Sequence, residues 1–202
     1  MIAIIDYGMG NLRSVQKALS LLGYEAVITD QAEQVQAARG VILPGVGAFA
    51  DAMQNLQTRG MDQVIREVIK ADKPMLGICL GMQLLFSWSE ENNGVAGLDI
   101  IKGKVRRLPP GMKIPHMGWN DWRVEREDAF LKGIEPGSHV YFVHSYYVDP
   151  NDEGIVLTRT EYTNWFPSIV GQGNLLATQF HPEKSGRVGM RLLKNFGELV
   201  RA

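Results

Sequence analysis

The residue best suited to covalent chemistry is Cys79, the single cysteine of the chain, which lies between two glycines in residues 77–81. An apolar run precedes this segment and a helical pattern follows it, which is the order of a nucleophile elbow. In such an elbow a sharp turn presents the nucleophile at its tip, and the start of the helix favours a thiolate. The backbone N–H of Leu80 would then be well placed to hold a developing oxyanion. The alternative is a packing turn in which the cysteine is only a small buried apolar side chain.

A cysteine nucleophile needs a general base, and four histidines are available. His181 stands two residues before Glu183, so the two side chains project to the same side of an extended segment. The carboxylate can then accept the imidazole N–H, fix its tautomer and stabilise the imidazolium ion, which leaves the other nitrogen for Cys79. His144 is the rival base, but it lies in an apolar stretch with no acid close by in sequence except Asp149. For the His-Pro-Glu segment, an ordinary strand-end turn with a surface acid is the alternative.

A glycine-rich segment, residues 44–49, follows another apolar run that predicts a buried strand. Ligands of α/β proteins collect at the carboxyl ends of strands, so this loop is expected close to Cys79. It could supply a second oxyanion donor from the backbone N–H of Val46 or Gly47. A glycine-rich turn that only leads into a helix explains the same residues, and the pattern alone does not separate the two interpretations.

Gly8 and Gly10, after the first apolar run, invite comparison with the dinucleotide-binding fingerprint. Arg13 occupies the position of the third glycine, and no acidic residue ends the next predicted strand before Asp30. We therefore reject a dinucleotide site at this loop.

The first half of the sequence alternates unbroken apolar runs, typical of strands covered on both faces, with one-sided apolar stripes, typical of helices. Strands are expected at 2–5, 24–28, 41–43 and 75–78. Helices are expected from Leu12 to Leu22 with Asn11 as a cap, at 32–38, in two stretches before residue 75, and at about 81–88. This alternation predicts a doubly wound, largely parallel central sheet flanked by helices.

The second half has short predicted strands close together, near 100–107, 120–125, 140–148, 154–160 and 167–179. Such spacing favours antiparallel strands added to the parallel core. A last helix carries apolar residues on one face: Val188, Leu192, Phe196 and Val200. Because no repeat, low-complexity tract or linker divides the chain, we predict a single α/β domain over residues 1–202, with its antiparallel strands in the C-terminal half.

The composition excludes several classes of protein. With 21 basic and 22 acidic residues among 202, the formal net charge of −1 offers no general attraction for nucleic acid or an anionic membrane. Alternating basic residues in 102–107 are typical of the solvent face of a strand. No apolar run reaches the length of a membrane span, and the N-terminal run lacks the basic flank of a signal peptide. With one cysteine and no clustered histidines, we expect a cytoplasmic protein that holds neither metal nor cofactor.

The segments around Cys79 and His181, and the spacing between them, resemble the motifs of the triad-type, or class I, glutamine amidotransferases, and the likeness covers essentially the whole chain. The resemblance implies that Cys79, His181 and Glu183 hydrolyse glutamine to glutamate and ammonia. It also implies substrate contacts from the side chain of Gln83 and from the backbone of two neighbouring residues, Ser145 and Tyr146.

Residues 6–12, 44–49 and 115–120 resemble, more narrowly, the glutaminase subunits of imidazole glycerol phosphate synthases. The resemblance implies a heterodimer with a (β/α)₈-barrel cyclase subunit. That subunit uses the ammonia and a ribonucleotide to form imidazole glycerol phosphate and aminoimidazole carboxamide ribonucleotide in histidine biosynthesis. The residues then expected to face the partner are Asn11, Arg13, Met117, Trp119, Asn120, Tyr141 and Lys184.

In this family the peptide of residues 44–47 can point a carbonyl at the oxyanion site until the partner binds its acceptor. We therefore expect little glutaminase activity from the isolated chain. Three alternatives remain: Trp119 lies in the core, the subunit serves another acceptor synthase, or the scaffold carries a non-catalytic binding protein.

Overall fold

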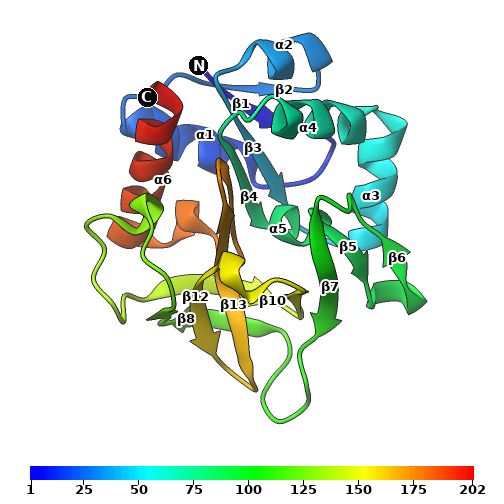
Figure 1. Ribbon diagram of the computed structural model, residues 1–202, viewed down its shortest axis with the longest axis vertical. Helices are drawn as coiled ribbons and strands as arrows, with labels where there is room; N and C mark the ends of the chain where they lie inside the picture. The colour runs from blue at the N-terminus through cyan, green and yellow to red at the C-terminus, as the bar shows by residue number, and fades with distance from the viewer.

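Parallel strands form the centre of the computed structural model, which describes residues 1–202 (Figure 1). Their order in the sheet is β2-β1-β3-β4-β14, and each pairs in parallel with its neighbour. Four of them are buried along their whole length, as their unbroken apolar sequences predict, whereas β2 lies at the edge. Their bounds are β1 Ile2–Ile5, β2 Ala26–Thr29, β3 Gly40–Gly45, β4 Met75–Cys79 and β14 Leu175–Thr178.

Three antiparallel strands extend this sheet beyond β14. In order from β14 they are β13 (Trp165–Gln172), β12 (Val156–Glu161) and β9 (Arg123–Val124). A parallel centre with antiparallel additions from the second half of the chain confirms the predicted α/β fold.

Helices cover both faces of the parallel strands (Figure 1). Side chains alternate along β1, so that Ile2 and Ile4 pack in one core with α1 and α6, while Ala3 and Ile5 pack in the other with α2, α3 and α4. This two-sided cover is what makes the sheet doubly wound. The helices are α1 Leu12–Leu21, α2 Ala32–Ala37, α3 Phe49–Thr58, α4 Met61–Lys70 and α6 Gly186–Arg201.

Two smaller sheets lie beside the carboxyl end of the parallel strands. One has the order β11-β7-β5-β6, and the other pairs β10 with β8. In β7 buried and exposed residues largely alternate, which confirms that its basic side chains form a solvent face. The strands are β5 Phe86–Ser89, β6 Val95–Ala96, β7 Ile101–Arg107, β8 His116–Asn120, β10 Val140–His144 and β11 Tyr146–Pro150, and the short 3-10 turns are Glu91–Asn93, Ala129–Leu131, Glu153–Ile155 and Pro182–Lys184.

The prediction of a helix over 81–88 is wrong in its second half. The helix α5 covers only Leu80–Leu84, and β5 follows it directly. The carbonyl of Leu85 accepts hydrogen bonds from the N–H groups of Ile100 and Ile101. This pairing with a later segment ends the helix, and the apolar pattern of residues 81–88 does not reveal it because the pairing depends on residues 100 and 101, outside that pattern.

The predicted strand 140–148 is divided at Ser145, because β10 pairs with β8 and β11 pairs with β7 in another sheet. Asn11 precedes α1, but its side chain makes no capping hydrogen bond. None of the helices has the length and apolarity that crossing a membrane requires.

Candidate active site

The turn at Cys79 is a strained elbow between β4 and α5. Cys79 has a φ of 55° and a ψ of −111°, a conformation that L-residues rarely adopt. Glycines on both sides make the turn possible: a Cβ at Gly81 would lie 1.9 Å from the carbonyl oxygen of Leu43, and one at Gly77 would lie 3.0 Å from the carbonyl oxygen of Gly81. The predicted spacing of glycines therefore has a steric cause.

The thiol of Cys79 is almost wholly enclosed. Its Sγ lies 3.8 Å from the carbonyl oxygen of Val143, on β10, and 3.9 Å from the amide Nε2 of Gln179, which follows β14. With 6% of the residue exposed, only a small opening leads to the sulfur. A reagent must therefore enter through the pocket that the residue lines.

His181 and Glu183 form a buried pair next to this thiol. Nδ1 of His181 lies 2.9 Å from Oε1 of Glu183, and the two side chains are 2% and 0% exposed. Burial opposes a charge on His181, but the interactions with Cys79 and with the Glu183 carboxylate outweigh it and raise the pKa of His181 to about 9. Nε2 of His181 has no hydrogen-bond partner of good geometry. The imidazole can therefore take a proton from the thiol and deliver one to a leaving group.

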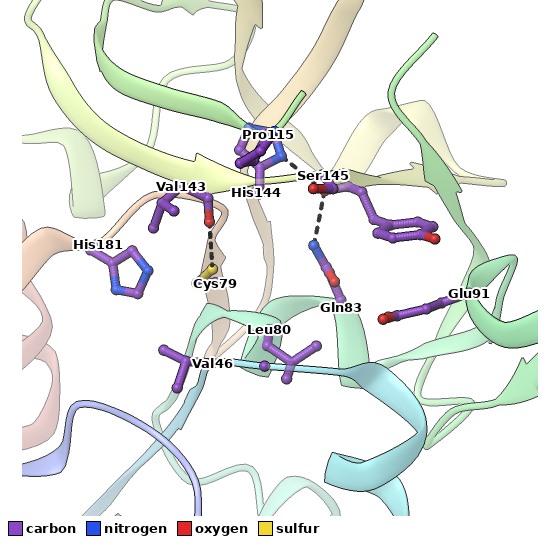
Figure 2. A pocket seen from close by; sticks show the side chains of 12 residues that line it. Val46, Cys79, Leu80, Gln83, Glu91, Pro115, Val143, His144, Ser145 and His181 are labelled. Carbon is purple, nitrogen blue, oxygen red and sulfur yellow. Dashed lines mark hydrogen bonds between the residues drawn. The ribbon is translucent and has the colours of Figure 1, made fainter. Parts of the chain in front are cut away.

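A cavity of about 320 Å³ opens in front of the thiol (Figure 2), a size typical of small-molecule sites. Gln83, from α5, points into it, and its Nε2 donates to the carbonyl oxygen of Tyr146 at 2.9 Å and to Oε1 of Gln179 at 3.1 Å. The lining residues come from six separate segments: Val46, Gly47, Cys79, Leu80, Gln83, Glu91, Pro115, Val143, His144, Ser145, Tyr146 and His181.

All three residues predicted for the oxyanion site line this cavity. Val46 and Gly47 lie beyond the end of β3, and Leu80, the first residue of α5, lies beside Val46 (Figure 2). Gly47 has a φ of +95°, so this turn favours glycine. The structure thus brings the predicted loop and the elbow to one place, as expected for two adjacent parallel strands.

Comparison with known proteins agrees with the site described above. The family model described as "Glutamine amidotransferase class-I" matches residues 3–199. The chain belongs to this family. It is 60% identical to the imidazole glycerol phosphate synthase subunit HisH of Moorella thermoacetica, over 99% of this chain and 95% of that protein. It is 52% identical to the HisH subunit of Caldanaerobacter subterraneus subsp. tengcongensis, over 100% and 99% of the two chains.

A crystal structure of a glutamine amidotransferase has the same fold as this class-I amidotransferase. The two superpose with a TM-score of 0.79 over the full length of both chains, at 24% sequence identity. The match includes the antiparallel strands of the second half, because it covers both chains completely.

Sequence reasoning missed Glu91, a charged residue in the pocket of this amidotransferase. Its Oε2 accepts a hydrogen bond from the backbone N–H of Phe49 at 3.0 Å, and its side chain lies on the Gln83 side of the cavity (Figure 2). It is the single carboxylate that lines the cavity. Glu90, Glu91 and the following asparagines look like an ordinary polar turn, so no local pattern distinguishes Glu91.

The rival base, His144, also lines the cavity, but both of its ring nitrogens have other partners. Nδ1 lies 2.8 Å from the carbonyl oxygen of Tyr146, and Nε2 lies 2.9 Å from Nδ1 of His116. Burial lowers the pKa of His144 to about 3. A neutral, doubly engaged imidazole is a poor base, so the geometry favours His181.

The residues expected at a partner surface fall into two places. Met117 and Trp119 are 62% and 57% exposed on β8, so the alternative of a core position for Trp119 is wrong. The ring of Trp119 meets that of Tyr141 edge-to-face at 6.0 Å. Asn120 ends the same strand, Lys184 is exposed beside the triad, and Asn11 donates to Oε1 of Glu183 at 3.4 Å. Arg13, the second residue of α1, lines another hollow with Asp6, Leu12, Gln16, Val27 and Ile28.

Proposed function

We propose that this chain is the glutaminase subunit of imidazole glycerol phosphate synthase. It hydrolyses glutamine and passes the ammonia to a (β/α)₈-barrel cyclase subunit in histidine biosynthesis. The observation that carries the proposal is the buried His181–Glu183 pair beside Cys79 at a strained elbow, in a family that acts on glutamine. The names of the HisH relatives support the choice of synthase.

In the first half of the reaction, Sγ of Cys79 attacks the side-chain carbonyl carbon of glutamine, and its proton passes to Nε2 of His181. The oxygen that becomes negative is held by the N–H of Leu80 and by one from Val46 or Gly47. The tetrahedral intermediate then collapses. The C–N bond breaks, His181 gives its proton to the nitrogen, and ammonia leaves behind a γ-glutamyl thioester.

In the second half, His181 removes a proton from water as the water oxygen attacks the thioester carbon. The C–S bond breaks, glutamate forms, and the proton returns to the sulfur. Glu183 accepts from Nδ1 of His181 at 2.9 Å, so it fixes the tautomer and stabilises the imidazolium in both halves.

The far side of the cavity is suited to the amino-acid end of glutamine. Gln83 and the Ser145–Tyr146 backbone supply amide and peptide groups, as the resemblance implies, and Glu91 supplies the negative charge that an α-ammonium group needs.

We assign the cyclase-facing surface to Asn11, Arg13, Met117, Trp119, Asn120, Tyr141 and Lys184. Exposed methionine and tryptophan are typical of interfaces. This surface is close to the triad, because the N–H of His181 donates to the carbonyl of Tyr141 at 3.1 Å and Asn11 contacts Glu183. A partner that binds to and displaces these residues would therefore change the positions of His181 and Glu183. The enzyme works in the cytoplasm, where reducing conditions keep Cys79 a free thiol.

Glutamate release from glutamine tests this proposal. The purified chain is assayed alone, with the barrel cyclase subunit, and with that subunit and its ribonucleotide acceptor. Without the partner and its acceptor, we expect the peptide of residues 44–47 to leave the oxyanion site one donor short. A missing oxyanion donor lowers the rate about a hundredfold or more, so we expect strong activity only in the complete mixture. Activity that does not change when the partner is added would support the glutaminase activity but contradict the assignment to this synthase. A complete absence of activity, with Cys79 alkylated equally fast in the presence of glutamine, would reject the glutaminase.

A further inference from the structure

Two buried histidines outside the triad connect β8 to the cavity: His116 is the first residue of β8, and His144, the last residue of β10, lines the cavity. His116 and His144 are 3% and 6% exposed. They face each other across the β8–β10 pair, and their rings are packed among aromatic side chains, with Tyr162 stacked on His116 at 4.0 Å and Phe166 edge-on to His144 at 4.9 Å. Buried polar groups in such surroundings persist only when each one is hydrogen-bonded.

The hydrogen bonds of this pair have one possible direction. A carbonyl oxygen only accepts, so Nδ1 of His144 carries the proton that it shares with Tyr146 at 2.8 Å. Burial lowers the pKa of His144 to about 3 and that of His116 to about 4, so both rings are neutral near pH 7. Nε2 of His144 therefore accepts from Nδ1 of His116 at 2.9 Å. Nε2 of His116 in turn accepts from the amide Nδ2 of Asn120 at 3.3 Å.

We propose that Asn120, His116 and His144 form a one-directional hydrogen-bond relay that positions the Tyr146 carbonyl at the wall of the glutamine pocket. Asn120 is anchored at the other end, because its Nδ2 also donates to the carbonyl of Glu161 at 2.8 Å. The relay begins on the strand that exposes Met117 and ends on the cavity wall.

The relay ends at the carbonyl oxygen of Tyr146, which accepts two hydrogen bonds. The carbonyl oxygen of Tyr146 receives a hydrogen bond from His144 and a second one, at 2.9 Å, from Gln83. Both of its lone pairs are then occupied, so the peptide after Tyr146 cannot rotate without breaking a buried bond. His116 and His144 are thus positioning residues for glutamine binding. This role rests on the proposed function, whereas the relay itself does not.

The relay is tested first by NMR of the full-length chain with ¹⁵N-labelled histidine. We expect both neutral rings to show a protonated Nδ1 and an unprotonated Nε2, the tautomer that is the minor one for histidine free in water. This pattern should persist from about pH 5 to pH 9. A protonated Nε2 in either neutral ring would overturn the relay, whatever the enzyme's activity.

Kinetics of the complex with its cyclase subunit test the positioning role. His144→Phe keeps an aromatic ring but removes the donor, and His144→Asn keeps a donor near the Nδ1 position. Loss of a hydrogen bond of this kind corresponds to about a 2- to 10-fold change, so we expect KM for glutamine to rise by that factor in His144→Phe, with a smaller change in kcat. His144→Asn should recover most of the loss.

His116→Phe, which breaks the middle of the relay, should raise KM in the same way. The matched control is Tyr162→Phe, which keeps the ring stacked on His116 and removes only the hydroxyl that donates to the backbone carbonyl of Lys113. An unchanged KM in both folded Phe variants at 116 and 144, or an equal rise in the control, would overturn the positioning role. If the wild-type complex hydrolyses no glutamine, the proposed function fails while the NMR result still decides the relay.

Discussion

The hydroxyl of Tyr7 donates a 2.8 Å hydrogen bond to the carbonyl oxygen of Pro44 in the protein interior. Tyr7 follows β1 and is fully buried, and burial, with a smaller effect from Cys79, raises the pKa of its phenol, so the group stays a neutral donor. Gly45 follows Pro44, and a Cβ at Gly45 would lie 2.7 Å from the Tyr7 hydroxyl. Tyr7 therefore holds the start of the loop that carries Val46.

Tyr7→Phe removes this donor and leaves the buried carbonyl of Pro44 without it. We expect the free energy of unfolding to fall by about 1–3 kcal/mol, the cost of an unsatisfied buried polar group. Because the oxyanion loop is then less firmly placed, kcat of the complete complex should fall about fivefold, equivalent to about 1 kcal/mol. Urea denaturation and glutamate release measure the two effects. A variant as stable and as active as wild type would contradict this role.

Cys79→Ala and Cys79→Gly both remove the nucleophile, so both should abolish glutamate release. They differ in backbone strain, because only glycine adopts the φ of 55° without cost. We expect Cys79→Gly to be more stable than Cys79→Ala by about 1 kcal/mol, since the relief of strain is partly offset by the greater freedom of glycine when unfolded. Thermal and urea denaturation of the two variants give the comparison. Equal stability would mean that the strain relieved at the elbow is no larger than the entropic cost of glycine, and turnover by either folded variant would exclude Cys79 as the nucleophile.

Glu183→Gln keeps the shape of the side chain but removes its charge. The imidazolium of His181 loses its partner, so the pKa of His181 should move down from about 9. Loss of the orienting acid in related catalytic arrangements is costly, and we expect kcat to fall by about 10³- to 10⁴-fold. NMR titration of His181 and single-turnover kinetics check the two statements. Asn11→Ala is the matched control, because it removes the weaker 3.4 Å contact and leaves the charge.

The same pair predicts a dependence of stability on pH. The pKa of His181 in the folded protein, about 9, is above the ordinary value of about 6.5 in the unfolded chain. The stabilising contribution is therefore fully present below about pH 6.5 and is lost as the pH rises through about 9. We expect the stability advantage of wild type over Glu183→Gln to shrink across this range in urea denaturation. An advantage that grows toward pH 9 would show that the pKa is lowered instead.

Glu91→Gln tests the assignment of the α-ammonium site. The glutamine side chain can still accept from the N–H of Phe49, so the local fold is kept while the charge is lost. A hydrogen bond to a charged group contributes about 1.5–3 kcal/mol, so KM for glutamine should rise about 10- to 100-fold. Glu90→Gln is the matched neighbour, since Glu90 pairs with Arg106 and does not line the cavity. Equal effects of the two substitutions would remove Glu91 from the site.

The fold class was predictable because its signals are local. Unbroken apolar runs such as Ile2–Ile5 require cover on both faces, and this requirement leads to a parallel sheet between helices. The elbow was also predictable, because only glycine fits at position 81, where a Cβ would meet the Leu43 carbonyl. The two-residue spacing of His181 and Glu183 predicted that their side chains pair, and in the structure Nδ1 of His181 lies 2.9 Å from Oε1 of Glu183.

Other features depend on contacts between segments that no local pattern encodes. The end of α5 is set by hydrogen bonds from Ile100 and Ile101 to Leu85, so a helical apolar pattern misled the prediction. Asn11 was expected to cap α1, but folding places it against Glu183, which lies far away in the sequence.

The sequence by itself determined which residues can react, because a lone cysteine between glycines and a histidine two residues before an acid are chemical facts of the chain. Only the tertiary structure decided what surrounds them. It brought Glu91 into the cavity, gave both nitrogens of His144 to other partners, and joined β8 to the pocket through His116. The physical reason is that reactivity follows from side-chain type and spacing, whereas burial, tautomer and charge partner follow from long-range packing.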